Sequence, residues 1–171
     1  MIQVGIGNSW LTVLDHPSGN RPDNSKRVRS RRALGERAMA HDMSMHILVV
    51  DDYATMIRII RNLLKQLGFE NIDDASDGAA ALDKMRAKKY GLVISDWNME
   101  PMNGYDLLRE VRADSNLATT PFIMITAESK TENVIAAKKA GVNNYIVKPF
   151  NAVTLKAKID TVFPDRAAQV A

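Results

Sequence analysis

Five polar residues of this chain each follow a short apolar run, and their side-chain types suit phosphoryl chemistry. Asp96 ends one such run, and the pair Asp51 and Asp52 comes directly after another. Thr126 and Lys148 follow two more. Ligands of a parallel α/β sheet bind beyond the carboxyl ends of the strands, so these side chains are expected to converge on one site. Three carboxylates, a hydroxyl and an ammonium suit a divalent cation and a phosphoryl group.

The carboxylates of this predicted site suit both a metal ligand and a nucleophile. Mg²⁺ prefers oxygen ligands and usually takes one or two carboxylates together with phosphate oxygens. Clustered carboxylates repel one another, and a cation compensates for that repulsion. A carboxylate can also attack phosphorus to form an aspartyl phosphate, with Lys148 pairing with a phosphoryl oxygen and Thr126 donating a hydrogen bond. The Lys148–Pro149 peptide is a candidate for a cis bond, which would aim the ammonium inward.

Each of these residues also has an ordinary structural explanation when it is taken alone. Asp51 and Asp52 could be surface loop aspartates, Lys148 could be a surface lysine, and Thr126 could simply end a strand. The position of all of them at predicted strand ends favours a functional site over these separate explanations.

The elements that must position these residues alternate between continuous apolar runs and amphipathic segments. The runs predict strands buried on both faces, and apolar residues at helical spacing predict helices between them. Strands are expected at residues 47–50, 72–75, 91–95, 121–126 and 144–147. Helices are expected at residues 53–67, from Asp77 and Gly78 onward, and at residues 104–111, 132–140 and 151–162. This alternation predicts an α/β fold with a doubly wound, five-stranded parallel sheet.

Residues 1–42 differ in composition from the rest of the chain. They are rich in turn-forming residues and carry a short basic cluster, which predicts a disordered basic extension. A start codon assigned too far upstream is an alternative explanation, since Met43 and Met45 directly precede the first predicted strand. We therefore expect a domain over residues 43–165 and a C-terminal tail over residues 166–171.

The net charge of +3 belongs to that extension. Residues 1–44 hold seven Lys and Arg against four Asp and Glu, whereas residues 45–171 hold sixteen of each. The predicted domain is therefore not expected to bind nucleic acid. The absence of cysteine excludes disulfides and thiolate metal sites. No apolar run is long enough to predict a transmembrane helix and the N-terminus lacks a signal-peptide pattern, so a cytoplasmic location without membrane insertion is expected.

Five short motifs occur in order at the ends of the predicted strands. They are Asp51-Asp52, Asp96-Trp97-Asn98-Met99, Met102-Asn103-Gly104, Thr126-Ala127-Glu128 and Lys148-Pro149-Phe150. Together they resemble the receiver domain of two-component response regulators over about residues 45–165, and most closely the single-domain receivers of chemotaxis. The resemblance implies a flavodoxin-like fold with strand order 2-1-3-4-5.

The resemblance also implies how phosphate and metal would be held. Asp96 would be the phosphorylation site and would accept its phosphoryl group from a histidine kinase. Asp51, Asp52 and Asp96 would hold Mg²⁺ together with the backbone carbonyl of Asn98.

A switch pair and two tuning residues follow from the same resemblance. Thr126 would be drawn towards the phosphoryl group while Tyr145 rotates inward. Asn98 and Glu128 stand where family members tune hydrolysis of the aspartyl phosphate, and their match to the family predicts a short-lived phosphoryl state. Glu100 departs from the family pattern, because many receivers have proline there. It would either add a negative charge beside the metal or face solvent.

The expected output is a protein–protein contact, because no DNA-binding or enzymatic domain is expected after the receiver. The resemblance implies a chemotaxis histidine kinase and a flagellar motor switch protein as partners, with a phosphatase as a third candidate. The binding face of this expected monomer would combine the helix at residues 132–140, the strand with Tyr145 and the helix at residues 151–162. A phosphate sink that competes for kinase phosphate is an alternative role with the same chemistry.

A true enzyme is the second class of function that the strand-end residues allow. Haloacid-dehalogenase phosphatases also place an aspartate, a threonine and a lysine in a doubly wound fold. They need a second aspartate two residues after the first as a general acid, and here that position is Asn98, which cannot supply a proton. The expectation is therefore a signalling protein that catalyses only its own phosphorylation and dephosphorylation.

Overall fold

The computed structural model of the chain describes residues 43–127 and 131–163. The predictions made for residues 1–42, for Glu128 and for the tail at residues 166–171 lie outside these ranges. Within the described part of the chain, no helix is both long and apolar enough to cross a membrane.

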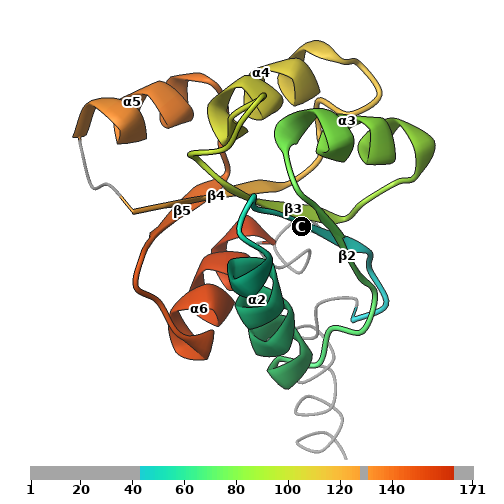
Figure 1. Cartoon of the computed structure of the whole chain (residues 1–171), viewed down its shortest axis with the longest axis vertical. Helices are drawn as coiled ribbons and strands as arrows, with labels where there is room; N and C mark the ends of the chain where they lie inside the picture. Colours follow the sequence, from blue (N-terminus) through green and yellow to red (C-terminus); the bar gives the residue numbers. More distant parts are fainter. Residues whose placement is uncertain (1–42, 128–130, 164–171) are drawn as a thin grey trace, which may run out of the picture. The chain divides into compact units, whose positions relative to one another are not determined.

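Five parallel strands form one sheet, and helices alternate with them along the chain (Figure 1). The strands are β1 (Ile47–Val50), β2 (Ile72–Ala75), β3 (Leu92–Asp96), β4 (Phe122–Thr126) and β5 (Asn144–Val147). The helices are α2 (Ala54–Gln66), α3 (Gly78–Ala87), α4 (Gly104–Ala113), α5 (Thr131–Lys139) and α6 (Ala152–Val162). The strand order β2-β1-β3-β4-β5 confirms the predicted doubly wound, flavodoxin-like fold.

The sheet separates two apolar cores. Within β1, Leu48 and Val50 belong to one buried cluster, and Ile47 and Val49 belong to the other. Helices α3, α4 and α5 cover the first face of the sheet, and α2 and α6 cover the second (Figure 1). Because both faces are covered, β1, β3 and β4 are buried at every position, which explains why these strands are continuous apolar runs in the sequence.

Side-chain caps fix where three of the described helices begin. Asp77, Asn103 and Asn151 each accept a hydrogen bond from the backbone N–H three residues later, at 2.8–2.9 Å. The helix predicted to begin at residue 151 therefore begins at Ala152, because Asn151 is its cap. The helix predicted from residue 53 likewise begins one residue later, with Tyr53 at the N-cap position.

The register of the sheet brings the strand ends to one edge. Val50, at the end of β1, pairs with Ser95 of β3. Thr126, at the end of β4, pairs with Val147 at the end of β5. The residues that directly follow these strands therefore emerge side by side, at the edge where the sequence predicted a site.

Candidate functional site

Four of the predicted site residues lie at this edge, and Lys148 contacts two of the carboxylates. The Lys148 Nζ atom lies 2.7 Å from Asp96 Oδ1 and 3.5 Å from Asp51 Oδ2. Asp51 and Asp96 are only 1% and 6% exposed. The Lys148 backbone N–H donates a hydrogen bond of 2.8 Å to the carbonyl oxygen of Thr126, which is also buried. We call Asp51, Asp96, Thr126 and Lys148 the strand-end site.

Burial and neighbouring charges set the protonation of this site. Burial raises the pKa of the Asp51 carboxyl above its usual range, and the negative charges of Asp96 and Asp52 add to that shift. The Tyr53 N–H, which donates to Asp51 Oδ1 at 2.8 Å, and the Lys148 ammonium oppose the shift without cancelling it. Burial by itself would lower the pKa of Lys148, but the two carboxylates outweigh it and raise that pKa. The ammonium is therefore held in its charged form.

The turn after β3 fixes the direction of the Asp96 carboxylate. Asp96 Oδ2 accepts a hydrogen bond from the Asn98 N–H at 2.8 Å, which leaves Oδ1 for Lys148. Gly104 packs directly on the backbone of Asp96, and a Cβ atom at Gly104 would lie 2.0 Å from the Asp96 carbonyl oxygen. The Gly104 N–H also donates to the Trp97 carbonyl oxygen at 3.0 Å. A glycine at this position therefore allows α4 to begin against the residue that carries the carboxylate.

Two proline peptides flank the strand-end site. The Lys148–Pro149 bond is cis, as hypothesised from the sequence. The Glu100–Pro101 bond is also cis, and this bond was not predicted from the sequence. Glu100 itself is exposed, as in the solvent-facing alternative considered for it.

Comparison with known proteins identifies the family. The model of the response regulator receiver domain matches residues 47–160. This chain belongs to the response regulator receiver family. The receiver is 52% identical over 120 residues to the chemotaxis protein CheY-3 of Vibrio cholerae, a match that covers 70% of this chain and 92% of the relative. It is 51% identical over 119 residues to the chemotaxis protein CheY of Pseudomonas aeruginosa, covering 70% of this chain and 96% of the relative.

Solved structures share the fold of this receiver. The CheY4 protein of Vibrio cholerae is 33% identical with a TM-score of 0.65, and the match covers 70% of this chain and 98% of that chain. The receiver domain of the sensor histidine kinase PA1611 from Pseudomonas aeruginosa is 27% identical with a TM-score of 0.63, covering 68% of this chain and 95% of that chain. That domain was solved with a magnesium ion coordinated in its active site cleft.

The acidic residues of the receiver suit a magnesium ion in their chemistry. Asp51 Oδ2 is buried without a hydrogen-bond partner, and carboxylate oxygens are ligands that Mg²⁺ prefers. Among the described residues, however, no three His, Cys, Asp or Glu side chains lie close enough together to hold a metal ion. The three-carboxylate group expected from the sequence is therefore not assembled in this structure. Asp52 is exposed, and the Lys148 ammonium contacts Asp51 and Asp96 instead.

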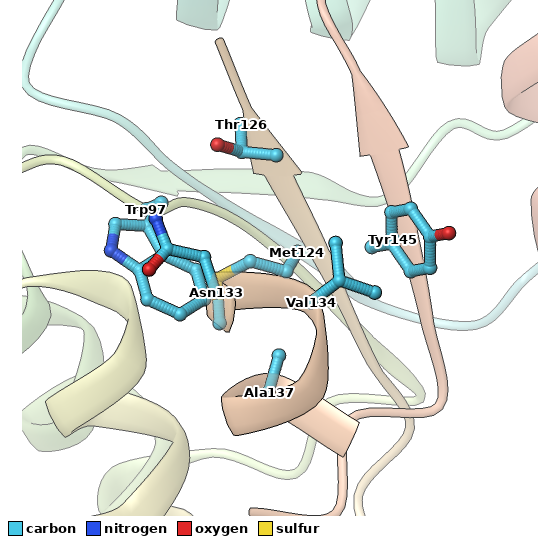
Figure 2. Close-up of a pocket in the computed structure, with 7 residues that line it drawn as sticks. All are labelled: Trp97, Met124, Thr126, Asn133, Val134, Ala137 and Tyr145. Atoms are coloured by element: carbon cyan, nitrogen blue, oxygen red, sulfur yellow. The ribbon is translucent and has the colours of Figure 1, made fainter. Parts of the chain in front are cut away.

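The predicted switch residues, Thr126 and Tyr145, line one small pocket of the receiver (Figure 2). The other lining residues are Trp97 after β3, Met124 on β4, and Asn133, Val134 and Ala137 on α5. Figure 2 shows the Tyr145 ring at the side of this pocket, with its hydroxyl directed away from Thr126. The structure thus brings the two residues to one pocket with Tyr145 in an outward position.

Two contacts around the pocket were missed by sequence reasoning. Trp97 stacks on Tyr105 of α4, with 5.4 Å between ring centroids and 22° between ring planes. The feature of the sequence that could have indicated this stacking is Tyr105, an aromatic residue directly after Gly104. The Lys158 Nζ atom of α6 lies over the Tyr145 ring, 5.1 Å from the centroid. That contact has no sequence signal, because it depends on how α6 packs against β5.

Proposed function

We propose that this receiver accepts a phosphoryl group on Asp96 from a histidine kinase and acts as a chemotaxis response regulator in the cytoplasm. The observation that carries the proposal is the contact of 2.7 Å between the Asp96 carboxylate and the Lys148 ammonium at the edge of the sheet. A buried carboxylate beside a fixed cation is suited to phosphoryl transfer, because the transferred oxygens need positive charge. The identity of 52% and 51% to two chemotaxis proteins supports the assignment to chemotaxis.

The proposed reaction transfers the phosphoryl group from a kinase phosphohistidine. An oxygen of Asp96 attacks the phosphorus atom, and the new O–P bond forms while the P–N bond breaks. The kinase imidazole leaves with the electron pair of that bond. Lys148 then pairs with the phosphoryl oxygens, and the Thr126 hydroxyl donates a hydrogen bond to them.

The acidic residues have a second proposed role as metal ligands. Asp51, Asp52, Asp96 and the backbone carbonyl of Asn98 would hold Mg²⁺, which supplies positive charge for the phosphoryl oxygens when it is bound. Hydrolysis of the aspartyl phosphate would end the signal. Asn98 and Glu128, whose residue types and positions resemble those of family members that tune this hydrolysis, would make the phosphoryl state short-lived.

Phosphorylation is proposed to bias a two-state switch. The added charge draws Thr126 towards the phosphoryl group, and Tyr145 moves inward towards the pocket. The face formed by α5, β5 and α6 then takes its binding-competent form. This face carries exposed apolar side chains, including Ile135 at 47% and Val147 at 37% exposure, which suit contact with a flagellar motor switch protein.

Tryptophan fluorescence tests the phosphoryl chemistry. Trp97 follows Asp96 directly, and a Trp10→Phe background in the full chain leaves it as the only tryptophan. The expected result is a Mg²⁺-dependent signal change that acetyl phosphate or beryllofluoride deepens, and no deepening in Asp96→Ala. If neither metal nor donor changes the signal while Asp96 is intact, the proposal fails.

A binding assay then separates the regulator from a phosphate sink. The purified motor switch protein is expected to bind the beryllofluoride-treated receiver more tightly than the untreated receiver. If phosphorylation occurs without any such binding, the phosphate-sink role is favoured.

A further inference from the structure

The Tyr145 ring contacts a charged side chain of α6, Lys158. The Lys158 Nζ atom of α6 lies 5.1 Å from the centroid of the Tyr145 ring. An ammonium over an aromatic face is attracted by the negative charge of the π-system. In this structure the ring is half-buried at the side of the pocket, and its hydroxyl points away from Thr126 (Figure 2). The attraction therefore acts on the outward position of Tyr145.

The ammonium of Lys158 is itself held in place by β5. Lys158 Nζ donates to Asn144 Oδ1 at 3.3 Å. The same Asn144 oxygen accepts from the Tyr145 N–H at 2.8 Å, and the Asn144 Nδ2 group donates to Thr161 Oγ1 at 2.6 Å. The Thr161 hydroxyl in turn donates to the Lys158 carbonyl oxygen at 2.8 Å. Asn144 thus connects the switch residue, the lysine and the last turns of α6.

We propose that Asn144 and Lys158, here called the Asn144–Lys158 pair, are positioning residues that hold Tyr145 outward in the unphosphorylated receiver. The inference rests on the proposed role of Tyr145 as the switch residue. A contact shifts an equilibrium only if it differs between the two states. Rotation of the ring into the pocket would carry it away from Lys158, so the cation–π contact stabilises the outward state alone. The Asn144–Lys158 pair therefore sets how much of the unmodified protein already has Tyr145 inward.

The size of the effect follows from the strength of such contacts at partly exposed sites. Loss of the ammonium is expected to raise the ratio of inward to outward Tyr145 by about two- to fivefold. Loss of the Asn144 side chain is also expected to raise the ratio of inward to outward Tyr145, but by a smaller factor. Lys158 would keep its charge and lose only the hydrogen bond to Asn144 Oδ1 that positions its ammonium.

Tyrosine NMR on the full chain tests the inference without any partner. The chain has four tyrosines, so ring-labelled protein gives few signals. A Tyr145→Phe variant identifies which of these signals belongs to Tyr145. Lys158→Met keeps the length of the side chain and removes its charge. We expect this variant to move the Tyr145 signal towards its inward value and to strengthen cross-peaks between the Tyr145 ring and the Met124 methyl group.

Matched variants separate charge from general perturbation of α6. Lys156→Met removes a neighbouring charge that pairs with Asp160 at 2.7 Å on the same helix, and it is expected to leave the Tyr145 signal unchanged. Lys158→Arg keeps a cation over the ring and is expected to restore the signal of the wild type. Thermal unfolding of each variant reports whether the fold is retained.

The outcomes distinguish this inference from the proposed function. If Lys158→Met and Asn144→Ala both leave the Tyr145 signal and its cross-peaks at wild-type values, the inference is overturned. An equal shift in Lys156→Met and Lys158→Met would overturn it as well. If Lys158→Met moves Tyr145 inward but beryllofluoride moves it in no variant, the Asn144–Lys158 pair is supported and the phosphoryl switch fails.

Discussion

Lys148 Nζ contacts Asp96 Oδ1 at 2.7 Å, so the ammonium from the end of β5 neutralises the carboxylate at the end of β3. The same ammonium lies 3.5 Å from Asp51 Oδ2. Both carboxylates are buried, and removing the cation would leave them facing each other in a medium of low dielectric constant. Lys148 therefore has a structural role in the resting protein, in addition to its proposed role towards phosphate.

Substitution of Lys148 by methionine tests the proposed catalytic role. We expect the rate of phosphorylation by acetyl phosphate to fall on the order of 10²-fold, because a charge that stabilises the transferred oxygens is lost. Phosphorylation is measured by mass spectrometry over time. Lys89→Met, which changes an exposed lysine, is the control and is expected to keep the rate of the wild type. A Lys148→Met protein that is phosphorylated at the same rate would contradict the role.

The raised pKa of Asp51 predicts how stability depends on pH. Because burial raises this pKa in the folded state above its unfolded value of 3.8, the folded protein binds the proton more tightly than the unfolded chain does. The free energy of unfolding therefore decreases as the pH rises from the unfolded value through the folded one. Asp51→Asn has no carboxyl to deprotonate, so its free energy of unfolding does not decrease in this way. We therefore expect this variant to be more stable than the wild type at pH 7.

Urea unfolding at several pH values measures this difference. The stability gain of Asp51→Asn is expected to shrink as the pH falls through the raised pKa of the folded state towards the unfolded value of 3.8. Lys148 does not interfere in this window, because its raised pKa affects stability only above its unfolded value of 10.5. A gain that is constant from neutral to acid pH would contradict the assignment to Asp51.

Gly104 is expected to tolerate no side chain. In Gly104→Ala the new Cβ atom would lie 2.0 Å from the Asp96 carbonyl oxygen, which is backbone and cannot rotate away. Alanine favours helix by up to about 1 kcal/mol over glycine, but overpacking against a fixed atom costs more, so we expect a net loss of about 2–3 kcal/mol. Phosphorylation of Asp96 is expected to slow in the same variant, because its backbone must shift.

Gly91→Ala is the matched control for that experiment. Its Cβ would lie 3.0 Å from the Met45 Cβ atom and 3.1 Å from its Sδ atom, so Met45 would have to give way by only a few tenths of an ångström. Chemical denaturation is expected to give a loss of under about 1 kcal/mol for this variant. Equal losses for the two variants would show that contact with the Asp96 backbone is not the cause.

Arg112 is expected to anchor two loops, the one between α4 and β4 and the one between α5 and β5. Its guanidinium donates to the carbonyl oxygens of Gly141, Ala118 and Thr120 and to Asn143 Oδ1, at 2.8–3.0 Å. Lysine cannot reproduce this fork, so we expect Arg112→Lys to lower the free energy of unfolding by about 1–3 kcal/mol. Hydrogen exchange near residues 140–143 should accelerate.

The exposed Arg109 of the same helix provides the comparison for Arg112. Arg109→Lys is expected to leave both stability and exchange near the wild type. If Arg112→Lys behaved like Arg109→Lys in both measurements, the anchoring role would be refuted.

Much of the fold follows from local features of the sequence. The continuous apolar runs predicted β1, β3 and β4 because central strands of a parallel sheet are buried on both faces, whereas the edge strands β2 and β5 are only partly buried. Gly68 and Gly141, which follow α2 and α5, have positive φ angles that favour glycine. Several predicted boundaries differ from the structure by one or two residues. One difference lies at Asn151, whose side chain bonds to the helix while its backbone is still extended.

Residue order is enough to show which chemical groups stand at the strand ends, because parallel strands must bring their carboxyl ends to one edge. Asp51, Asp96, Thr126 and Lys148 could be found in this way. The folded structure was needed to show that Lys148 contacts both buried carboxylates, that Asp52 is exposed and that Lys158 lies over Tyr145. Those relationships depend on side-chain directions and on the packing of helices against distant strands, which residue order alone does not fix.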